Sequence, residues 1–358
     1  MPLAMSRKIA TNKSPTVSLR HTKTDRMPII KNSTAAGKDL PMPSASTRLV
    51  GLDTTAASMR ESALPNVVLI LVESWGKARV ADLEAGLVQP YAEEGLFRKY
   101  TVRQGTVPFH GATVNGESRE LCGSAMGFGL LSASVSQLKG CLPARMNGMG
   151  YHTIGVHGNS GGIFNRREWY RRIGFDETWF KEGLQQRGLP VCPGPLPGIC
   201  DAAASAWIGD QLQRDSDSPE FIYWVTLNSH LPVPMTNLVK SPPSCEGIRA
   251  TAESPALCSW YQLEFNVHRS VAELAMRETA RPTVFLVVGD HAPPFSSDKL
   301  RSQFSDEVVP YVLLEPKADG IKETMPKAPS FAVAMRLPAR THRSRFRKIN
   351  LSRASGGQ

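Results

Sequence analysis

The chain alternates between short, wholly apolar runs and longer stretches with a helical pattern. The run Asn66–Val72 reads NVVLILV and has no polar residue after its first position. Comparable runs follow at Tyr151–Val156, Phe221–Leu227, Thr283–Val288 and Val308–Leu314. A continuous apolar run of this length is typical of a strand that is buried on both faces, as the strands of parallel sheets are.

Helix-compatible stretches separate these runs, notably Ala81–Tyr100, Asp201–Arg214 and Trp260–Thr279. Strands that alternate with helices predict an α/β domain, in which helices cover both faces of a mostly parallel sheet.

Polar residues gather where the predicted strands end. Glu73 follows the first strand, His157 the second, Asn228–His230 the third, and Asp290 with His291 the fourth. Ligands of open α/β sheets bind at the carboxyl ends of the strands. We therefore expect a functional site at this edge of the sheet.

Glu73, Asp290 and His291 form a mixed oxygen and nitrogen ligand set, which suits Zn or Mn. The segment 111–122, GATVNGESRELC, adds a turn of small residues that presents Thr113 just before a predicted helix. The N-terminus of that helix would offer backbone N–H groups to an anion. The pattern predicts a metal site with Thr113 as a nucleophile toward phosphorus or sulfur.

Each of these residues also has an ordinary structural explanation. Glu73 could cap a helix, and Thr113 could be a simple turn residue. For His157 we favour a structural role, satisfied by the backbone, over metal ligation. Most basic residues of 165–172 are expected on a solvated helix face.

The charge of the chain is unevenly distributed. Residues 1–50 contain nine Lys/Arg and two Asp/Glu, and residues 337–358 contain six Lys/Arg and no acid, so the segment between them carries −3 of the net +10. We predict a disordered basic segment at 1–64, a catalytic domain at 65–334 and a basic tail at 335–358. Because the domain itself is not basic, we expect no nucleic-acid partner.

Two further features bear on the compartment. No signal-peptide core and no run of 18 apolar residues is visible, although an incomplete start would look the same. The six cysteines, at 122, 141, 192, 200, 245 and 258, include no C-x-x-C pair. They are compatible with buried thiols or with three disulfides, which would imply an oxidising compartment, and the sequence does not fix their connectivity.

The motifs VESWG, GATVNGE, HGN with FNR, LNSH and GDH occur in this order between residues 72 and 291. Together they resemble the alkaline phosphatase/sulfatase-like superfamily, and most closely its lipoteichoic acid synthase and phosphoglycerol or phosphoethanolamine transferase branch. The resemblance spans roughly residues 65–316. It implies one divalent metal ion and a phospho-threonine intermediate.

The resemblance also implies individual roles. Glu73, Thr113, Asp290 and His291 would bind the metal, with Thr113 also the nucleophile. Arg166 and His230 would hold the phosphate or headgroup, His230 would also transfer protons, and Phe164 would stand where such synthases often have Trp. Cysteines paired with their neighbours along the chain would match the extracytoplasmic phosphoethanolamine transferases.

The implied partners are a phospholipid headgroup donor and an envelope glycan or lipid acceptor, in an extracytoplasmic location. The chain departs from this branch in two ways. A polar basic segment replaces the usual N-terminal membrane helices, so any membrane contact would be peripheral, through the basic tails. No His lies between His291 and His342, which favours the phosphoglycerol branch.

The motifs also leave room for a sulfatase. Cys141–Arg145, CLPAR, fits the C-x-P-x-R pattern of the modified cysteine in true sulfatases. It lies 68 residues after Glu73, whereas Thr113 lies 40 residues after it, nearer to the superfamily interval. Glu73-Ser74 also replaces the paired Asp of true sulfatases, and CLPAR is better interpreted as the helix before the next strand. The sequence is compatible, too, with a phosphodiesterase and with a non-catalytic binding protein.

Overall fold

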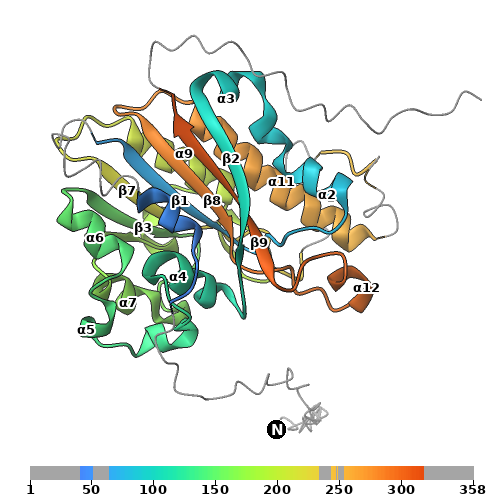
Figure 1. The fold of residues 1–358 in the computed structure, drawn as a ribbon, viewed down its shortest axis with the longest axis horizontal. Coiled ribbons are helices and arrows are strands. Elements are labelled where there is room, and N and C mark those ends of the chain that lie inside the picture. Colours follow the sequence, from blue (N-terminus) through green and yellow to red (C-terminus); the bar gives the residue numbers. More distant parts are fainter. Residues whose placement is uncertain (1–40, 51–63, 234–242, 247, 249–253, 318–358) are drawn as a thin grey trace, which may run out of the picture.

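The computed structural model describes residues 41–50, 64–233, 243–246, 248 and 254–317. Its centre is a seven-stranded sheet with the order β2-β9-β8-β1-β7-β3-β4 (Figure 1). The strands are β1 (Asn66–Val72), β2 (Tyr100–Pro108), β3 (His152–His157), β4 (Glu177–Trp179), β7 (Glu220–Val225), β8 (Thr283–Gly289) and β9 (Val308–Pro316). A separate pair consists of β5 (Val191–Cys192) and β6 (Gly198–Ile199).

The middle of the sheet is parallel and one side is antiparallel. β1 lies between β7 and β8, and β3 lies between β7 and β4, all in parallel pairs. β9 is antiparallel to both β8 and β2. The predicted fold class, a mostly parallel sheet of the alkaline phosphatase/sulfatase type, is confirmed. Because β8, β1, β7 and β3 are parallel neighbours, their carboxyl ends lie at the same edge of the sheet.

Helices cover both faces of the sheet (Figure 1). One face carries α2 (Ala81–Val88), η3 (Gln89–Ala92), α3 (Glu94–Lys99), α8 (Lys181–Gln186), α9 (Asp201–Leu212) and α11 (Pro255–Met276). The other carries η1 (Ala45–Val50), α4 (Thr113–Cys122), η4 (Gly127–Leu131), α5 (Val135–Leu138), α6 (Leu142–Gly148) and α7 (Arg166–Arg172). The short elements η5 (Ile163–Asn165) and α12 (Asp298–Arg301) complete the described part.

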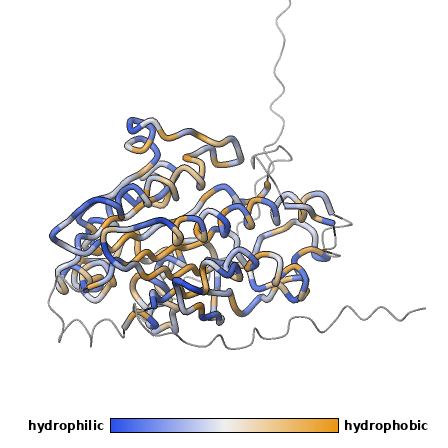
Figure 2. The backbone as a smooth tube through the Cα atoms, turned by 90° about the horizontal axis from the view of Figure 1, so that it is seen from above, coloured by the Kyte–Doolittle hydropathy of each residue, from blue (hydrophilic) through white to orange (hydrophobic). Residues whose placement is uncertain are grey.

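Alternate residues of β1 divide the core into two layers. Val68 and Ile70 pack with the α11 layer, whereas Val67 and Leu69 pack with the α4 layer. All four are fully buried. Successive strand residues point to opposite faces, so an unbroken apolar run is what a doubly covered strand requires. Figure 2 shows the hydropathy of each residue along the backbone, with apolar positions in the middle of the described part.

The helix-compatible stretch Ala81–Tyr100 does not form one continuous helix. The segment forms α2, a 3-10 turn at η3 and the separate helix α3. Pro90 lies in that turn, and a proline removes a backbone donor and clashes with the preceding turn of an α-helix. Tyr100 begins β2, an edge strand that the apolar pattern did not reveal because most of its residues are exposed or half-buried.

Part of the predicted disordered N-terminal segment is instead packed on the domain. The carboxylate of Glu120 in α4 accepts hydrogen bonds from the N–H groups of Ala45, at 3.3 Å, and Ser46, at 2.9 Å. The Ser46 hydroxyl donates to the Glu120 carbonyl at 2.7 Å, and Ala45 is fully buried. Leu64 is also described. The rest of the predicted segment 1–64 lies outside the described residues, as do residues 318–334 and the basic tail at 335–358.

Three disulfides link cysteines that are neighbours along the chain: Cys122–Cys141, Cys192–Cys200 and Cys245–Cys258. The pairing implied by the resemblance is confirmed, and the interpretation of the six cysteines as buried thiols is wrong. Among the described residues, no helix has both the length and the apolar character needed to span a bilayer.

We predict that His268 makes the fold sensitive to acid. Its ring is fully buried in α11, with Nδ1 3.0 Å from the Tyr91 hydroxyl, and burial lowers its pKa to about 3. Between pH about 6.5 and about 3 the unfolded chain binds a proton that the folded protein excludes. The contribution of neutral His268 to the free energy of unfolding is therefore fully present above pH about 6.5. Between pH about 6.5 and about 3 it falls by about 1.4 kcal/mol per pH unit as the pH drops.

Urea unfolding at pH 7 and pH 4.5 tests this prediction. The variant His268→Gln should lose less stability between the two pH values than the wild type does. His110→Gln, at an exposed position, is the matched control and should behave like the wild type. Equal losses in the wild type and His268→Gln would contradict the prediction.

Candidate active site

Glu73 and Ser74 form the turn at the end of β1. Both side chains are buried, and Ser74 adopts a left-handed backbone conformation, with φ 62°. Its N–H donates to Asp290 Oδ1 at 2.7 Å, and its hydroxyl donates to Glu73 Oε1 at 3.0 Å. Since a non-glycine residue rarely adopts this conformation, Ser74 holds a strained turn that binds both carboxylates.

Asp290 and His291 follow β8, the parallel neighbour of β1. The Asp290 N–H donates to the Val72 carbonyl at 3.1 Å, which locks the two strand ends together. Gly289 allows this approach, because a Cβ atom there would lie 2.0 Å from the Trp75 carbonyl oxygen. Any larger residue would therefore force the ends of β1 and β8 apart.

Three ligand atoms, one each from Glu73, Asp290 and His291, lie within 4.8 Å of one another. His291 Nε2 is 3.3 Å from Asp290 Oδ2 and 3.6 Å from Glu73 Oε1. Within the described residues, the buried Asp290 Oδ2 has no hydrogen-bond partner. His291 Nδ1 lies 2.9 Å from the Ala292 carbonyl, which can only accept, so Nε2 is the nitrogen available to a ligand.

This donor set fits a divalent cation. Two carboxylates and one imidazole are ligands that Zn and Mn accept, and a cation would satisfy the orphaned oxygen of Asp290. The predicted ligands are thus brought together by the fold, while the identity of the metal stays a prediction.

Thr113 begins α4 next to this cluster. Its Oγ1 donates a hydrogen bond to Glu73 Oε2 at 2.9 Å. Gly116, one turn later, lets the helix lie against Asp290, because a Cβ atom there would be 3.0 Å from the Asp290 Cβ. The N–H groups of the first turn of a helix have no partner within the helix and can bind an anion. The predicted turn-to-helix presentation of Thr113 is confirmed.

Burial and mutual charge shift the pKa values of the cluster. Burial raises the pKa of Asp290, and the Glu73 charge raises it further. Burial opposes the ionised form of Glu73, but the positive charges of His291 and His230 and two hydroxyl hydrogen bonds outweigh it and lower the pKa. Burial also disfavours protonated His291, yet the two carboxylates raise its pKa. The site concentrates negative charge that a cation would neutralise.

Arg166 is buried, not part of a solvated surface. Its Nε lies 3.1 Å from both carboxylate oxygens of Glu117, and its Nη2 lies 3.0 Å from Oε2. The Tyr170 hydroxyl donates to the same carboxylate at 2.8 Å. This pairing raises the pKa of Arg166 although burial opposes it. Arg166 is therefore a fixed cation whose Nη1 is not used by the Glu117 pair.

Phe164 lies beside Arg166 on a strained turn. Phe164 and Asn165 both have φ 52°, and the Arg166 guanidinium carbon is 5.1 Å from the centre of the Phe164 ring. The ring also meets the exposed Phe128 edge-on, with centroids 5.7 Å apart. Phe164 thus supplies an aromatic wall next to the cation.

His230 and His157 lie at the ends of β7 and β3. His230 is half-buried and directly follows Ser229, whose hydroxyl donates to the Glu73 carbonyl at 2.6 Å. His157 Nδ1 is 3.2 Å from the Val225 carbonyl, and burial, followed by the charge of Arg166, lowers its pKa well below the usual value. The preferred interpretation of His157 as a structural histidine satisfied by the backbone agrees with this geometry.

The sequence pattern did not identify several residues of the site. Glu117 lies one helical turn after Thr113, a spacing that places both on one face of α4, and this signal could have identified it. Asp201 in α9 accepts the N–H groups of Leu227 and Asn228, at 2.7 to 3.1 Å, and so fixes the chain that leads to His230. Its role depends on a contact between segments far apart in sequence.

Arg119 was likewise missed. It is buried, donates to Glu120 at 2.6 Å and also donates to the Gly289 carbonyl at 2.6 Å. Arg119 thereby joins α4 to the strand end that carries Asp290.

Cys141 cannot serve as a sulfatase-type nucleophile in this structure. Its sulfur is bonded to Cys122, and the residue directly precedes α6. The interpretation of CLPAR as the helix before β3 is confirmed. The C-x-P-x-R match therefore reflects a disulfide and a helix start.

The sequence matches the sulfatase family over residues 65–318. It is 26% identical over 203 residues to a protein described as a putative cyclic β-1,2-glucan modification protein of Rhizobium meliloti (strain 1021). That match covers 53% of this chain and 30% of the relative, so the chain spans less than a third of the relative's length.

Solved structures with a similar fold include the lipoteichoic acid synthase LtaP of Listeria monocytogenes, at 13% identity and TM-score 0.48, with 72% of this chain and 67% of that one covered. Another is the phosphoglycerol transferase GacH of Streptococcus pyogenes, in complex with sn-glycerol-1-phosphate, at 15% identity and TM-score 0.49. That match covers 77% of this chain and 78% of GacH.

Proposed function

Because the chain belongs to the sulfatase family, we propose that it transfers a phosphoglycerol or phosphoethanolamine headgroup from a phospholipid to an envelope acceptor, with Thr113 as the nucleophile. The observation that carries this proposal is the hydrogen bond of 2.9 Å between Thr113 Oγ1 and Glu73, within the Glu73, Asp290 and His291 cluster. A lone turn threonine would not meet a buried carboxylate that is itself one of three candidate metal ligands.

In the first step the Thr113 oxygen attacks the phosphorus of the donor. Glu73 Oε2, which already accepts the Thr113 hydroxyl, takes its proton. A new bond forms between Thr113 Oγ1 and phosphorus, and the bond from phosphorus to the lipid oxygen breaks. His230 gives a proton to the leaving lipid alkoxide. The products are a lipid alcohol and Thr113 esterified by the headgroup phosphate.

In the second step an acceptor hydroxyl replaces Thr113 on phosphorus. His230 takes the acceptor proton, and the Thr113 oxygen leaves with the proton held by Glu73. Arg166 Nη1 and the first N–H groups of α4 stabilise the phosphate oxygens in both steps. A divalent cation bound by Glu73, Asp290 and His291, with Thr113, would neutralise charge on the phosphodiester and lower the pKa of the hydroxyl.

A relative named for cyclic β-1,2-glucan modification supports a glucan as the acceptor class. We take a neutral glucan as the acceptor and phosphoglycerol as the favoured headgroup. The three disulfides support an extracytoplasmic location, because such bonds persist in oxidising compartments. Water in place of the glucan would make the protein a phosphodiesterase that uses the same intermediate.

Mass spectrometry of the trapped intermediate tests the proposal. The full chain is incubated with phosphatidylglycerol vesicles and Zn²⁺ or Mn²⁺, quenched in acid and digested. We expect a phosphoglyceryl group on the peptide that contains Thr113, and its loss when EDTA is added first. Phosphatidylethanolamine vesicles, run in parallel, identify the headgroup. A label on another residue, or no label with either lipid and either metal, would refute Thr113 as the nucleophile.

A further inference from the structure

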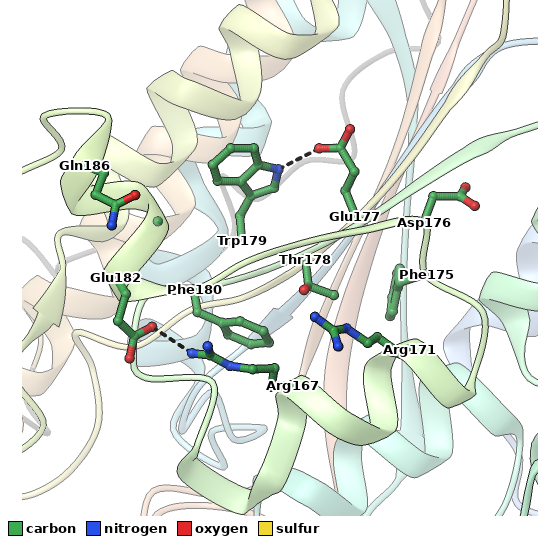
Figure 3. Close-up of a pocket in the computed structure, with 11 residues that line it drawn as sticks. Arg167, Arg171, Phe175, Asp176, Glu177, Thr178, Trp179, Phe180, Glu182 and Gln186 are labelled. Atoms are coloured by element: carbon green, nitrogen blue, oxygen red, sulfur yellow. Dashed lines mark hydrogen bonds and ion pairs between the residues drawn. The ribbon is translucent and has the colours of Figure 1, made fainter.

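A cavity of about 530 Å³ opens at the free edge of β4, outside the candidate active site (Figure 3). α7 contributes Arg167 and Arg171 to its walls, β4 contributes Thr178, and the start of α8 contributes Glu182. Phe180, between β4 and α8, contributes its ring. The volume lies within the range of roughly 300–1,000 Å³ that small-molecule sites enclose.

The walls of this β4 cavity combine hydrogen-bond donors, acceptors and aromatic surface. Arg167 is held in place by Glu182, at 3.3 Å, and its guanidinium lies 5.8 Å from the centre of the Phe180 ring. Glu182 is itself held by the Ser160 hydroxyl at 2.6 Å. In the part of the chain that the structure describes, the Arg171 side chain forms no hydrogen bond or ion pair. It is therefore available to a ligand.

β4 adds backbone groups to the cavity. It pairs only with β3, so its other edge leaves N–H and C=O groups of Glu177–Trp179 without a strand partner among the described residues. Unpaired groups of an edge strand are strong donors and acceptors. The cavity thus offers backbone hydrogen-bond donors and acceptors along β4, beside the Phe180 ring.

The charge of the cavity favours a neutral ligand over a phosphate. Three carboxylates, Asp176, Glu177 and Glu182, line it together with two arginines. The surplus of negative charge repels a polyanion, since like charges that face each other are unfavourable. A neutral sugar ring has hydroxyls that both donate and accept, and an apolar C–H face that packs on an aromatic ring. Its chemistry matches the walls.

We propose that the β4 cavity binds a hexopyranose unit of a neutral glycan. Arg171 donates to ring hydroxyls through its planar fork, and the carboxylates accept from them. Thr178 adds a hydroxyl, and the aromatic wall covers the apolar face of the sugar. The proposed function names a glucan acceptor, and the cavity would hold a part of that chain away from the reacting hydroxyl. This acceptor role rests on the proposed function, whereas the binding itself does not.

The loop at residues 158–162, after β3, contacts two of the residues that line the cavity. Within it, Ser160 binds Glu182 of the cavity, and the Gly161 carbonyl accepts the Arg167 N–H at 2.9 Å. Arg166 points from the same helix start toward Glu117 in the active site. A glycan chain that crosses this loop would therefore reach both places.

Isothermal titration calorimetry of the full chain with a linear β-1,2-gluco-oligosaccharide tests the proposal, with EDTA present so that no metal chemistry contributes. We expect saturable binding that Arg171→Ala weakens at least about tenfold, which is about 1.4 kcal/mol. Arg171→Lys should be weakened too, because Lys keeps the charge but lacks the planar fork. Thr178→Val should weaken binding without a change in charge.

Arg98→Ala is the matched control, because Arg98 lies on α3 and its side chain is 75% exposed. It should bind the sugar as the wild type does. No binding by the wild type, or equal affinity in the wild type, Arg171→Ala and Thr178→Val, would overturn the proposal. So would full rescue by Arg171→Lys together with competition by inorganic phosphate, since that pair of results identifies an anion site. Esterification of Thr113 is measured separately, so either conclusion can fail without the other.

Discussion

Replacement of Thr113 by Val is expected to lower kcat/KM for headgroup transfer by at least about 10³-fold, the scale seen when a covalent nucleophile is removed. Valine keeps the shape of threonine and removes only the hydroxyl that lies 2.9 Å from Glu73. The loss of one hydrogen bond to a charged group costs about 1.5–3 kcal/mol of stability. The expected result is therefore an inactive protein that remains folded.

The measurement compares transfer from phosphatidylglycerol to glucan, and cleavage of bis-nitrophenyl phosphate, in purified variants. Thr113→Ser should recover a large part of the activity because it restores a hydroxyl. Thr106→Val, an exposed threonine of β2, controls for the loss of a threonine elsewhere. If Thr113→Val transferred as fast as the wild type, the phospho-threonine mechanism would be wrong. A loss of cleavage by water, with no glucan transfer in the wild type, would identify a phosphodiesterase.

Breaking the Arg166–Glu117 pair is expected to destabilise the fold by about 3–5 kcal/mol, because removal of one partner leaves the other charge buried without compensation. Arg166 is 1% exposed and Glu117 is fully buried. Arg166→Met and Glu117→Leu should each cause this loss. The double variant should lose much less than the sum of the two, since it removes both charges together.

Urea unfolding measures these free energies in a double-mutant cycle. The exposed pair Arg98–Glu94 on α3, whose side chains are 75% and 71% exposed, provides the matched cycle and should yield a coupling below about 0.5 kcal/mol. Additive losses at Arg166 and Glu117 would contradict a buried coupled pair. Arg166→Met should also reduce transfer, because the fixed cation beside the phosphate is lost.

The sequence alone was sufficient for the inner strands and for the residues at their ends. β1 matched its predicted bounds, and β3, β7, β8 and β9 matched theirs to within two residues. Glu73, Asp290 and His291 were found for the same reason. An apolar run records burial on both faces, and parallel neighbours must end at one edge, so local pattern and one topological rule suffice.

The edge strands of the sheet could not be predicted from an apolar pattern. β2 is formed mostly of exposed or half-buried residues, and its strand conformation comes from pairing with β9, about 200 residues away. The same holds for the helix start at Arg166, whose burial depends on Glu117, 49 residues earlier. The pattern predicted a solvated face for most of these basic residues, and Arg166 was set apart from them through the family resemblance. Only the fold shows that Arg166 is buried against Glu117.

What the sequence determined, then, is the central parallel layer, the set of ligand-type residues at its edge and the small-residue turn before Thr113. The tertiary structure decided which partners these residues have. It paired the six cysteines and buried Glu117 beneath Arg166. It also packed residues 41–50 on α4 and formed the β4 cavity. The physical reason is that periodicity reports whether a side chain is buried, whereas ion pairs, disulfides and cavities depend on distances between segments that the order of residues does not encode.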